Sequence, residues 1–252
     1  MTAPASAAAA LRALVAMELR LSARRGEGLL VTLVIPAAVL VFFAGSGLLP
    51  AGIGGAGGPV HWLLPGAIAL AVIASGLVSL GIATGYERAN GVLKLLGAAP
   101  VSPGVVVLAK LAAVLVVELA QLALLVAVAW LVLDWRPPSG LAPGLVVAGL
   151  LLGTLAFAGL GLLIAGTLRA EATLAVSNGL FLGFLMLGGI LLPVAHLAAP
   201  LDALARILPA AALSEVVRVG FGEPGDPSGA LALLAVWGGG AAALAARTFR
   251  VE

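Results

Sequence analysis

The chain has 252 residues, of which 62% are hydrophobic and only 10% are charged, with a formal net charge of +2. Soluble domains carry about 25% charged residues, so this composition excludes a soluble fold and indicates that lipid is the main solvent. The absence of cysteine excludes disulfide bonds, thiolate metal sites and a cysteine nucleophile.

The first predicted element is an amphipathic helix over residues 7–25. It has an apolar side and a basic side, represented by Leu11, Leu14, Leu21, Arg12, Arg20 and Arg24. Such a helix suits the cytoplasmic face of a membrane, where it would lie in the interface. A solvated segment leading into the first span is the alternative.

Six apolar runs are long enough to cross a bilayer, which requires about twenty residues. They are residues 29–49, 63–84, 105–133, 144–168, 174–194 and 229–246. Helices are expected because lipid offers no other partner to the backbone N–H and C=O groups. We therefore predict an all-α polytopic membrane protein, folded as a single transmembrane domain over residues 1–252.

The distribution of basic residues predicts the orientation of these spans. Ten of the 13 lysine and arginine residues fall on one side of the predicted membrane: Arg12, Arg20, Arg24, Arg25, Arg88, Lys94, Lys110, Arg169, Arg247 and Arg250. Loops rich in lysine and arginine stay in the cytoplasm. Both termini and the 85–104 segment are therefore expected to be cytoplasmic.

The connection at residues 195–228 lies between the fifth and sixth spans, on the outer side in this orientation. It is rich in leucine and valine, and Pro200 and Pro209 interrupt it. Proline is favoured in the first turn of a helix. We predict two short re-entrant helices that dip towards the membrane, each opened by a proline.

Glu118 and Gln121 are a polar pair one helical turn apart, near the middle of the third span. A carboxylate at this depth costs about 2.5–3.5 kcal/mol on insertion scales, so the pair should face protein or water. Two interpretations remain open: a polar spot on a substrate path or subunit seam, and a structural hydrogen bond to a neighbouring helix.

The segment from Tyr86 to Pro100 is a charged, helix-compatible island between two long apolar runs. Large apolar residues stand among its charges, namely Val92, Leu93, Leu95 and Leu96. A solvated loop has no need of them, whereas a short amphipathic helix that docks into a groove on another protein does.

No nucleotide or metal site is predicted in the chain. The phosphate-binding pattern G-x-x-x-x-G-K-[ST] does not occur in the sequence. The two histidines, His61 and His196, have no neighbours with metal-ligand spacing. We expect neither catalysis nor a bound cofactor in this chain.

The charged segment from Tyr86 to Pro100 resembles the coupling region of the membrane subunit of type-2 ABC exporters. The resemblance rests on the pattern Glu87-Arg88-x-x-Gly91-x-Leu93-x-x-Leu96-x-x-x-Pro100, followed by Lys110 at the start of the next span. The Glu18-Leu19-Arg20 segment with Arg24 resembles the interfacial helix of that family, and residues 193–221 resemble its paired outer helices. The pair Ala89-Asn90 departs from the more charged pair usual after Glu-Arg.

The resemblance implies a permease subunit that pairs with a second permease, identical or paralogous, and sits on two cytoplasmic ATPase subunits in the inner membrane of a bacterium. ATP and Mg would be bound by the ATPase. The residues that would couple the permease to it are Glu87, Arg88, Gly91, Leu93, Leu96, Glu18 and Arg24. The predicted function is ATP-driven export of a hydrophobic or amphipathic substrate. The alternatives are an ion-driven secondary carrier, which should carry paired intramembrane acids, and an assembly factor for haem or respiratory complexes.

Overall fold

The computed structural model describes residues 7–24, 26–50, 52–97 and 102–248, and all regular structure in these ranges is helical. The upright helices are α2 (Gly26–Ser46), the continuous helix formed by α3 (Pro59–Ile73), η2 (Ala74–Ser79) and α4 (Leu80–Ala89), then α6 (Pro103–Val132), α7 (Pro143–Thr167), α8 (Ala170–Leu187) and α11 (Ser228–Thr248). The shorter elements are α1 (Ala7–Arg24), η1 (Gly55–Gly57), α5 (Val92–Gly97), η3 (Val194–His196), α9 (Ala199–Arg206) and α10 (Pro209–Gly220).

The predicted all-α fold is confirmed for the described residues, and the long helices agree with a polytopic membrane protein. Five helices are long and apolar enough to cross a membrane, and α2 provides a shorter apolar helix, Thr32–Ser46. The fifth predicted span, 174–194, is shorter than expected because α8 ends at Leu187. Gly188 follows it, and Gly189 then has a φ of +66°, which favours glycine.

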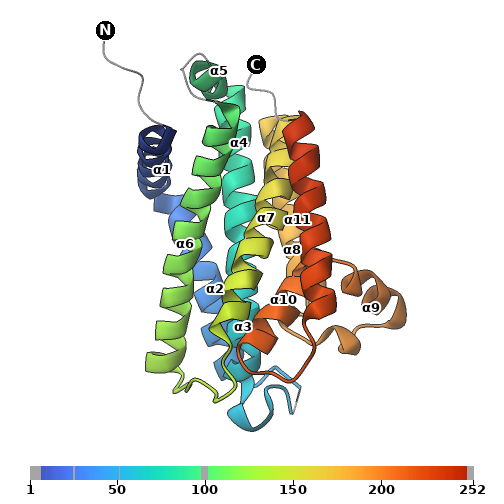
Figure 1. Cartoon of the computed structure of the whole chain (residues 1–252). Helices are drawn as coiled ribbons and strands as arrows, with labels where there is room; N and C mark the ends of the chain where they lie inside the picture. The colour runs from blue at the N-terminus through green and yellow to red at the C-terminus, as the bar shows by residue number, and fades with distance from the viewer. Residues whose placement is uncertain (1–6, 25, 51, 98–101, 249–252) are drawn as a thin grey trace.

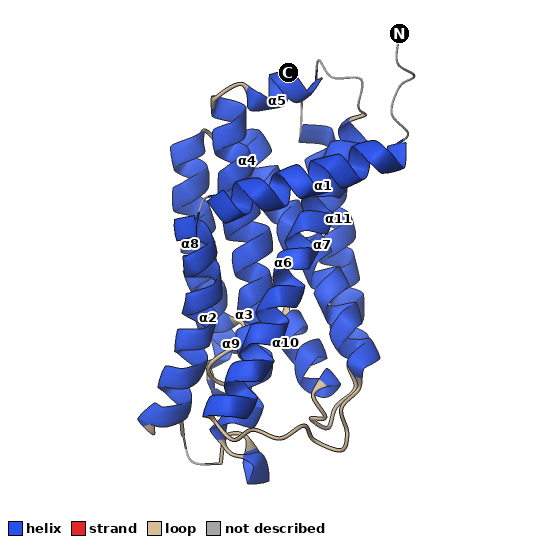
Figure 2. Ribbon diagram, turned by 90° about the vertical axis from the view of Figure 1, so that its left-hand side faces the viewer, coloured by secondary structure: helices blue, strands red, loops and turns tan. Residues whose placement is uncertain are grey.

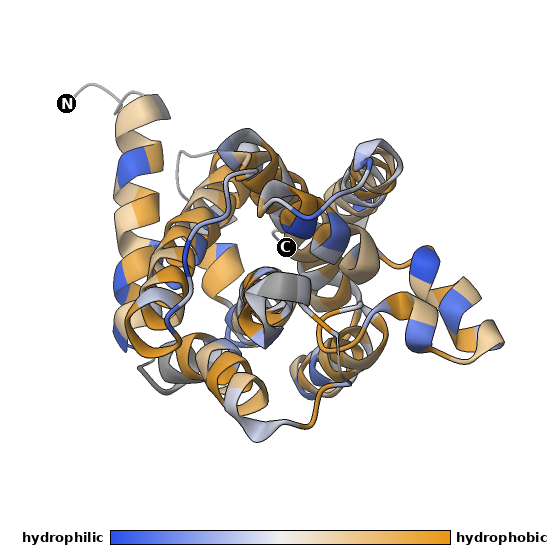
Figure 3. Cartoon of the chain, turned by 90° about the horizontal axis from the view of Figure 1, so that it is seen from below, coloured by the Kyte–Doolittle hydropathy of each residue, from blue (hydrophilic) through white to orange (hydrophobic). Residues whose placement is uncertain are grey.

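Figure 1 shows the upright helices as one bundle with two distinct ends. We call them the α5 end, where α1, α5 and the end of α11 lie, and the α9 end, which holds α9 and α10. In Figure 2, α1 runs obliquely across the bundle instead of along it. In Figure 3 the hydrophilic residues are conspicuous on α1 and α9, whereas the upright helices are mainly hydrophobic.

The continuous helix from Pro59 to Ala89 forms the centre of the bundle. Residues 63–77 are buried without interruption, which explains why the run is apolar on every side. Midway along it, η2 is a π-helical turn in which the Leu80 N–H bonds to the Ser75 carbonyl. Gly161 of α7 packs against this turn so closely that a Cβ there would lie 2.6 Å from the Gly76 oxygen.

The two short helices predicted within residues 195–228 are present, and each has a proline in its first turn. They differ in burial. α10 is buried along most of its length and packs against α3, α7, α8 and α11, whereas α9 buries only Ala205 and projects from the bundle (Figure 1). The helix that closes the α9 end of the bundle is therefore α10.

Candidate functional site

A buried ion cluster joins three helices at the α5 end. The Lys110 Nζ of α6 lies 2.8 Å from the Glu18 Oε1 of α1 and 2.7 Å from the Glu87 Oε2 of α4. The exposed fraction is 0% for the Lys110 side chain, 13% for that of Glu18 and 7% for that of Glu87. Two carboxylates thus share one ammonium away from water, a geometry in which removal of one partner is costly.

Helix packing brings these three residues together. α1 packs extensively on α6, and Lys110 lies on the α6 face that is buried in the bundle. Glu87 is in the last turn of α4, the helix that leads directly to α5. The cluster therefore connects the surface helix α1 to two helices of the bundle, and displacement of α4 would act on both.

Arg88 is an exposed residue whose guanidinium bonds back to the bundle. Its Nη1 donates to the Ala165 carbonyl at 2.8 Å and to the Gly166 carbonyl at 2.6 Å, in the last turn of α7. Carbonyls at the end of a helix lack intrahelical partners and carry partial negative charge. An arginine at this position donates hydrogen bonds to these carbonyls and its positive charge offsets theirs. Arg88 consequently ties the end of α4 to the end of α7.

The helix-compatible segment that starts at Tyr86 is divided between two helices, because α4 ends at Ala89 and α5 begins at Val92. Gly91 has a φ of +73°, a backbone conformation that favours glycine, and it starts a new direction for α5. On α5, the Leu93 side chain is 2% exposed, whereas that of Leu95 is 75% exposed. Residues 98–100 and the side chain of Leu96 lie outside the described part.

The exposed apolar surface of this region, which we call the α5 knob, consists of Tyr86, Val92 and Leu95. Leu93 had been expected on the docking side, but it packs inward and anchors α5 to the bundle. Basic residues are also exposed at this end of the molecule: Arg12, Arg20, Arg24 and Lys94. An apolar knob with basic neighbours suits a groove with an acidic rim on another protein.

Glu118 and Gln121 both face protein, as their depth predicted. Each is 1% exposed. Glu118 accepts a hydrogen bond from the Thr154 hydroxyl of α7. Gln121 accepts from the Ser75 hydroxyl at 2.9 Å and donates to the Thr32 carbonyl at 3.1 Å. These contacts are internal to one chain and favour the structural interpretation of the pair.

A second buried cation, Arg218 of α10, was not recognised in the sequence. Its Nη1 donates to the Trp62 carbonyl at 3.2 Å, its Nη2 donates to the Gly189 carbonyl, and its Cζ lies 3.1 Å from the centroid of the Trp62 ring. The neighbouring Glu223 is half-buried, and this burial raises the pKa of its carboxyl, an effect that the Arg218 charge opposes. The signal in the sequence was an arginine within a short helix that has only two other polar residues, Ser214 and Glu215.

Comparison with known families agrees with this architecture. The sequence profile described as ABC-2 type transporter matches residues 9–221, which include the ion cluster and the α5 knob. The chain belongs to the ABC-2 type transporter family. No curated protein matches the chain at a significant level.

Membership of the ABC-2 family defines the general role of the chain. It is a transmembrane permease domain of an ATP-driven transporter. The matched region runs from α1 to the residue that follows α10, so α11 lies beyond it. The resemblance inferred from the coupling segment and the outer helices is thereby confirmed.

Proposed function

We propose that this ABC-2 permease is half of the membrane part of an exporter and is driven by an ATPase on a separate chain. Two permeases would associate with two ATPase subunits, which hold the ATP and Mg. All six upright helices would span the membrane, α2 included. The α5 end and both termini would face the cytoplasm of a bacterium, and α9 and α10 would be re-entrant helices on the outer side.

The ion cluster carries this proposal because it links the surface helices to the bundle. When the ATPase closes on ATP, it would push the α5 knob, and the movement would pass through the Gly91 turn into α4. Glu87 would then pull on Lys110, and Lys110 on Glu18. Salt bridges within a buried cluster resist separation, so α1, α4 and α6 would move together.

This pathway gives the predicted coupling residues two different roles. Leu95, with Val92 and Tyr86, would touch the ATPase. Glu87 and Arg88 would transmit the movement from within the permease, since both bond to other helices of the same chain. Arg24 is exposed at the end of α1 and would face an acidic part of the ATPase.

We further propose that the substrate is hydrophobic or amphipathic and that it crosses along a seam between two permeases. The helix surfaces that remain for such a seam are apolar, with exposed side chains such as Phe42 on α2 and Leu182 on α8. Glu118 and Gln121 have partners inside one chain, so we assign them to packing rather than to the path.

The test is co-purification of the permease with a candidate ATPase, with wild-type chain compared with Leu95→Ser. Leu141→Ser is the matched control, because Leu141 is also exposed but lies in the loop between α6 and α7, at the opposite end. We expect Leu95→Ser to weaken ATPase binding at least tenfold, which corresponds to about 1.4 kcal/mol, and Leu141→Ser to leave it unchanged. Equal binding by both variants would contradict the assigned docking surface. Equal transport with and without the ATPase would contradict the function itself.

A further inference from the structure

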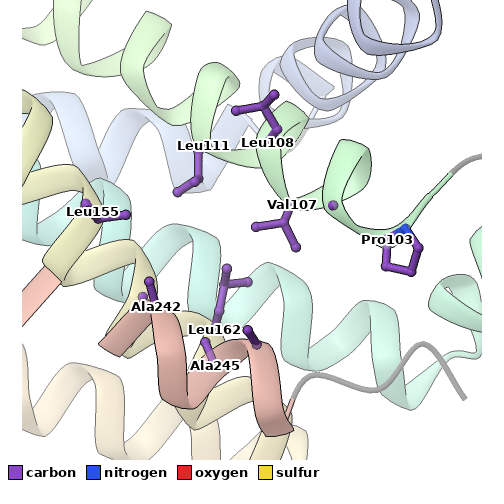
Figure 4. A pocket seen from close by; sticks show the side chains of 11 residues that line it. Pro103, Val107, Leu108, Leu111, Leu155, Leu162, Ala242 and Ala245 are labelled. Carbon is purple, nitrogen blue, oxygen red and sulfur yellow. The ribbon is translucent and has the colours of Figure 1, made fainter. Parts of the chain in front are cut away.

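A pocket of about 470 Å³ opens between α6, α7 and α11 near the α5 end. Its lining is mainly apolar, and none of the lining residues has a polar side chain: Pro103, Gly104, Val107, Leu108, Leu111, Leu155, Gly159, Leu162, Ala242, Ala245 and Ala246. Figure 4 shows side chains of all three helices converging on it. Neither the ion cluster nor the α5 knob contributes to this lining, so the pocket is separate from the coupling site.

Small residues on α11 explain the gap. Gly159 lets α11 approach α7 so closely that a Cβ there would lie 2.9 Å from the Ala241 Cβ. Beside this contact, Ala242, Ala245 and Ala246 extend too little to reach α6. The pocket is thus a consequence of close α7–α11 packing.

The depth of the pocket matches one leaflet of a bilayer. At 1.5 Å per residue, the lining on α6 extends over about 12 Å, from Pro103 to Leu111. On α7 its deepest lining residue, Leu155, lies about 18 Å from the end of the helix at Thr167. One leaflet has a hydrocarbon thickness of about 15 Å. An acyl chain of the leaflet at the α5 end would therefore lie alongside the whole pocket.

The charges at its mouth are basic. Arg247 follows the lining residue Ala246 directly and is exposed. Arg88, Lys94 and Arg169 are also exposed at this end, but none of them adjoins a lining residue in the sequence. Anionic lipids are attracted to such basic positions, by about fivefold in affinity for each lysine or arginine near the surface.

We propose that this pocket binds the acyl chain of an anionic phospholipid from the leaflet at the α5 end, with the phosphate beside Arg247. The apolar walls exclude a polar ligand, and the depth selects a chain that lies parallel to the helices. The positive mouth selects an anionic headgroup over a zwitterionic one. The bound lipid fills the space that the alanines of α11 leave beside α6.

Native mass spectrometry of the purified full chain tests this, with dioleoylphosphatidylglycerol and dioleoylphosphatidylcholine as probes. We expect one phosphatidylglycerol to be retained about fivefold more tightly than phosphatidylcholine. Arg247→Gln should remove this preference, while Arg169→Gln, a change at another exposed arginine, should not. Equal retention of the two lipids by the wild-type chain would overturn the proposed headgroup selection.

A second pair of variants tests the pocket itself. Gly104→Phe places a ring in the pocket, and a Cβ at Gly104 meets nothing within 4 Å, so the backbone tolerates the change. Gly239→Phe is the control, since Gly239 of α11 is equally open but does not line the pocket. Loss of the retained lipid only in Gly104→Phe supports the site. Unchanged lipid retention in Gly104→Phe, or loss of a bound protein subunit instead of the lipid, would show that the pocket is not a lipid site.

Discussion

Replacement of Lys110 by methionine is the most direct test of the ion cluster. Methionine has a similar length and keeps the packing, but it leaves Glu18 and Glu87 without the ammonium that lies 2.8 and 2.7 Å from their oxygens. Removing one partner of a buried ion pair costs about 3–5 kcal/mol. Both carboxylates lose this ammonium in surroundings largely shielded from water, since the Glu87 side chain is 7% exposed and that of Glu18 is 13% exposed.

The free energy of unfolding, measured by titration with a denaturing detergent, gives the assay. We expect Lys110→Met to lower the folding equilibrium constant by a factor of about 10²–10⁴. The triple variant Glu18→Gln/Lys110→Met/Glu87→Gln removes all three charges of the cluster together, and neutral replacement of a buried cluster is often without cost. The triple variant should therefore regain most of the lost stability.

Coupling separates the mechanical role of the cluster from its effect on stability. In complex with the ATPase, the triple variant should hydrolyse ATP but transport poorly, because amides and a thioether join the helices less strongly than charges do. A loss of less than about 1 kcal/mol in Lys110→Met, or a triple variant no more stable than Lys110→Met, would refute the energetic reasoning. Normal coupling in the stable triple variant would refute the role in transmission.

Three further variants address packing and the buried polar groups. Gly161→Ala should destabilise the bundle by about 1–3 kcal/mol, because the new Cβ would lie 2.6 Å from the Gly76 oxygen. Gly179→Ala should not destabilise it, since a Cβ there meets nothing within 4 Å, and thermal unfolding of the two variants checks this difference. Arg218→Gln should lower the free energy of unfolding in detergent by about 2–4 kcal/mol, because the backbone carbonyls lose a charged donor and the stacking on the Trp62 ring is lost. An unchanged free energy of unfolding would contradict the assigned bonds. Glu118→Gln should change the free energy of unfolding by less than about 1 kcal/mol, because an amide oxygen still accepts a hydrogen bond from the Thr154 hydroxyl. A substrate-selective loss of transport would instead place the residue on a substrate path.

The ion cluster illustrates the limit of sequence reasoning at the site. All three residues belong to the motifs that carried the family resemblance. In the sequence, however, Glu18 is 92 residues and Glu87 is 23 residues away from Lys110, which joins them. Their common position depends on how α1 crosses α6 and where α4 ends. No local pattern records that arrangement.

The α5 segment shows the same limit over a few residues. Its composition predicted a docking helix, but a six-residue helix is too short for its periodicity to indicate which side faces outward. Leu93 and Leu95 are equivalent in sequence terms, yet one is 2% exposed and the other 75% exposed. The Gly91 turn sets that difference by changing the direction of the chain.

The sequence by itself determined the solvent of this protein and the kind of element that it forms. Long apolar runs in a chain with 10% charged residues require helices in lipid, because the backbone must satisfy its own hydrogen bonds there. The tertiary structure alone decided which polar groups meet. A buried lysine, arginine or glutamate needs a partner, and in this bundle the partners come from helices far apart in the chain, as Lys110 with Glu18 and Arg218 with Trp62 demonstrate.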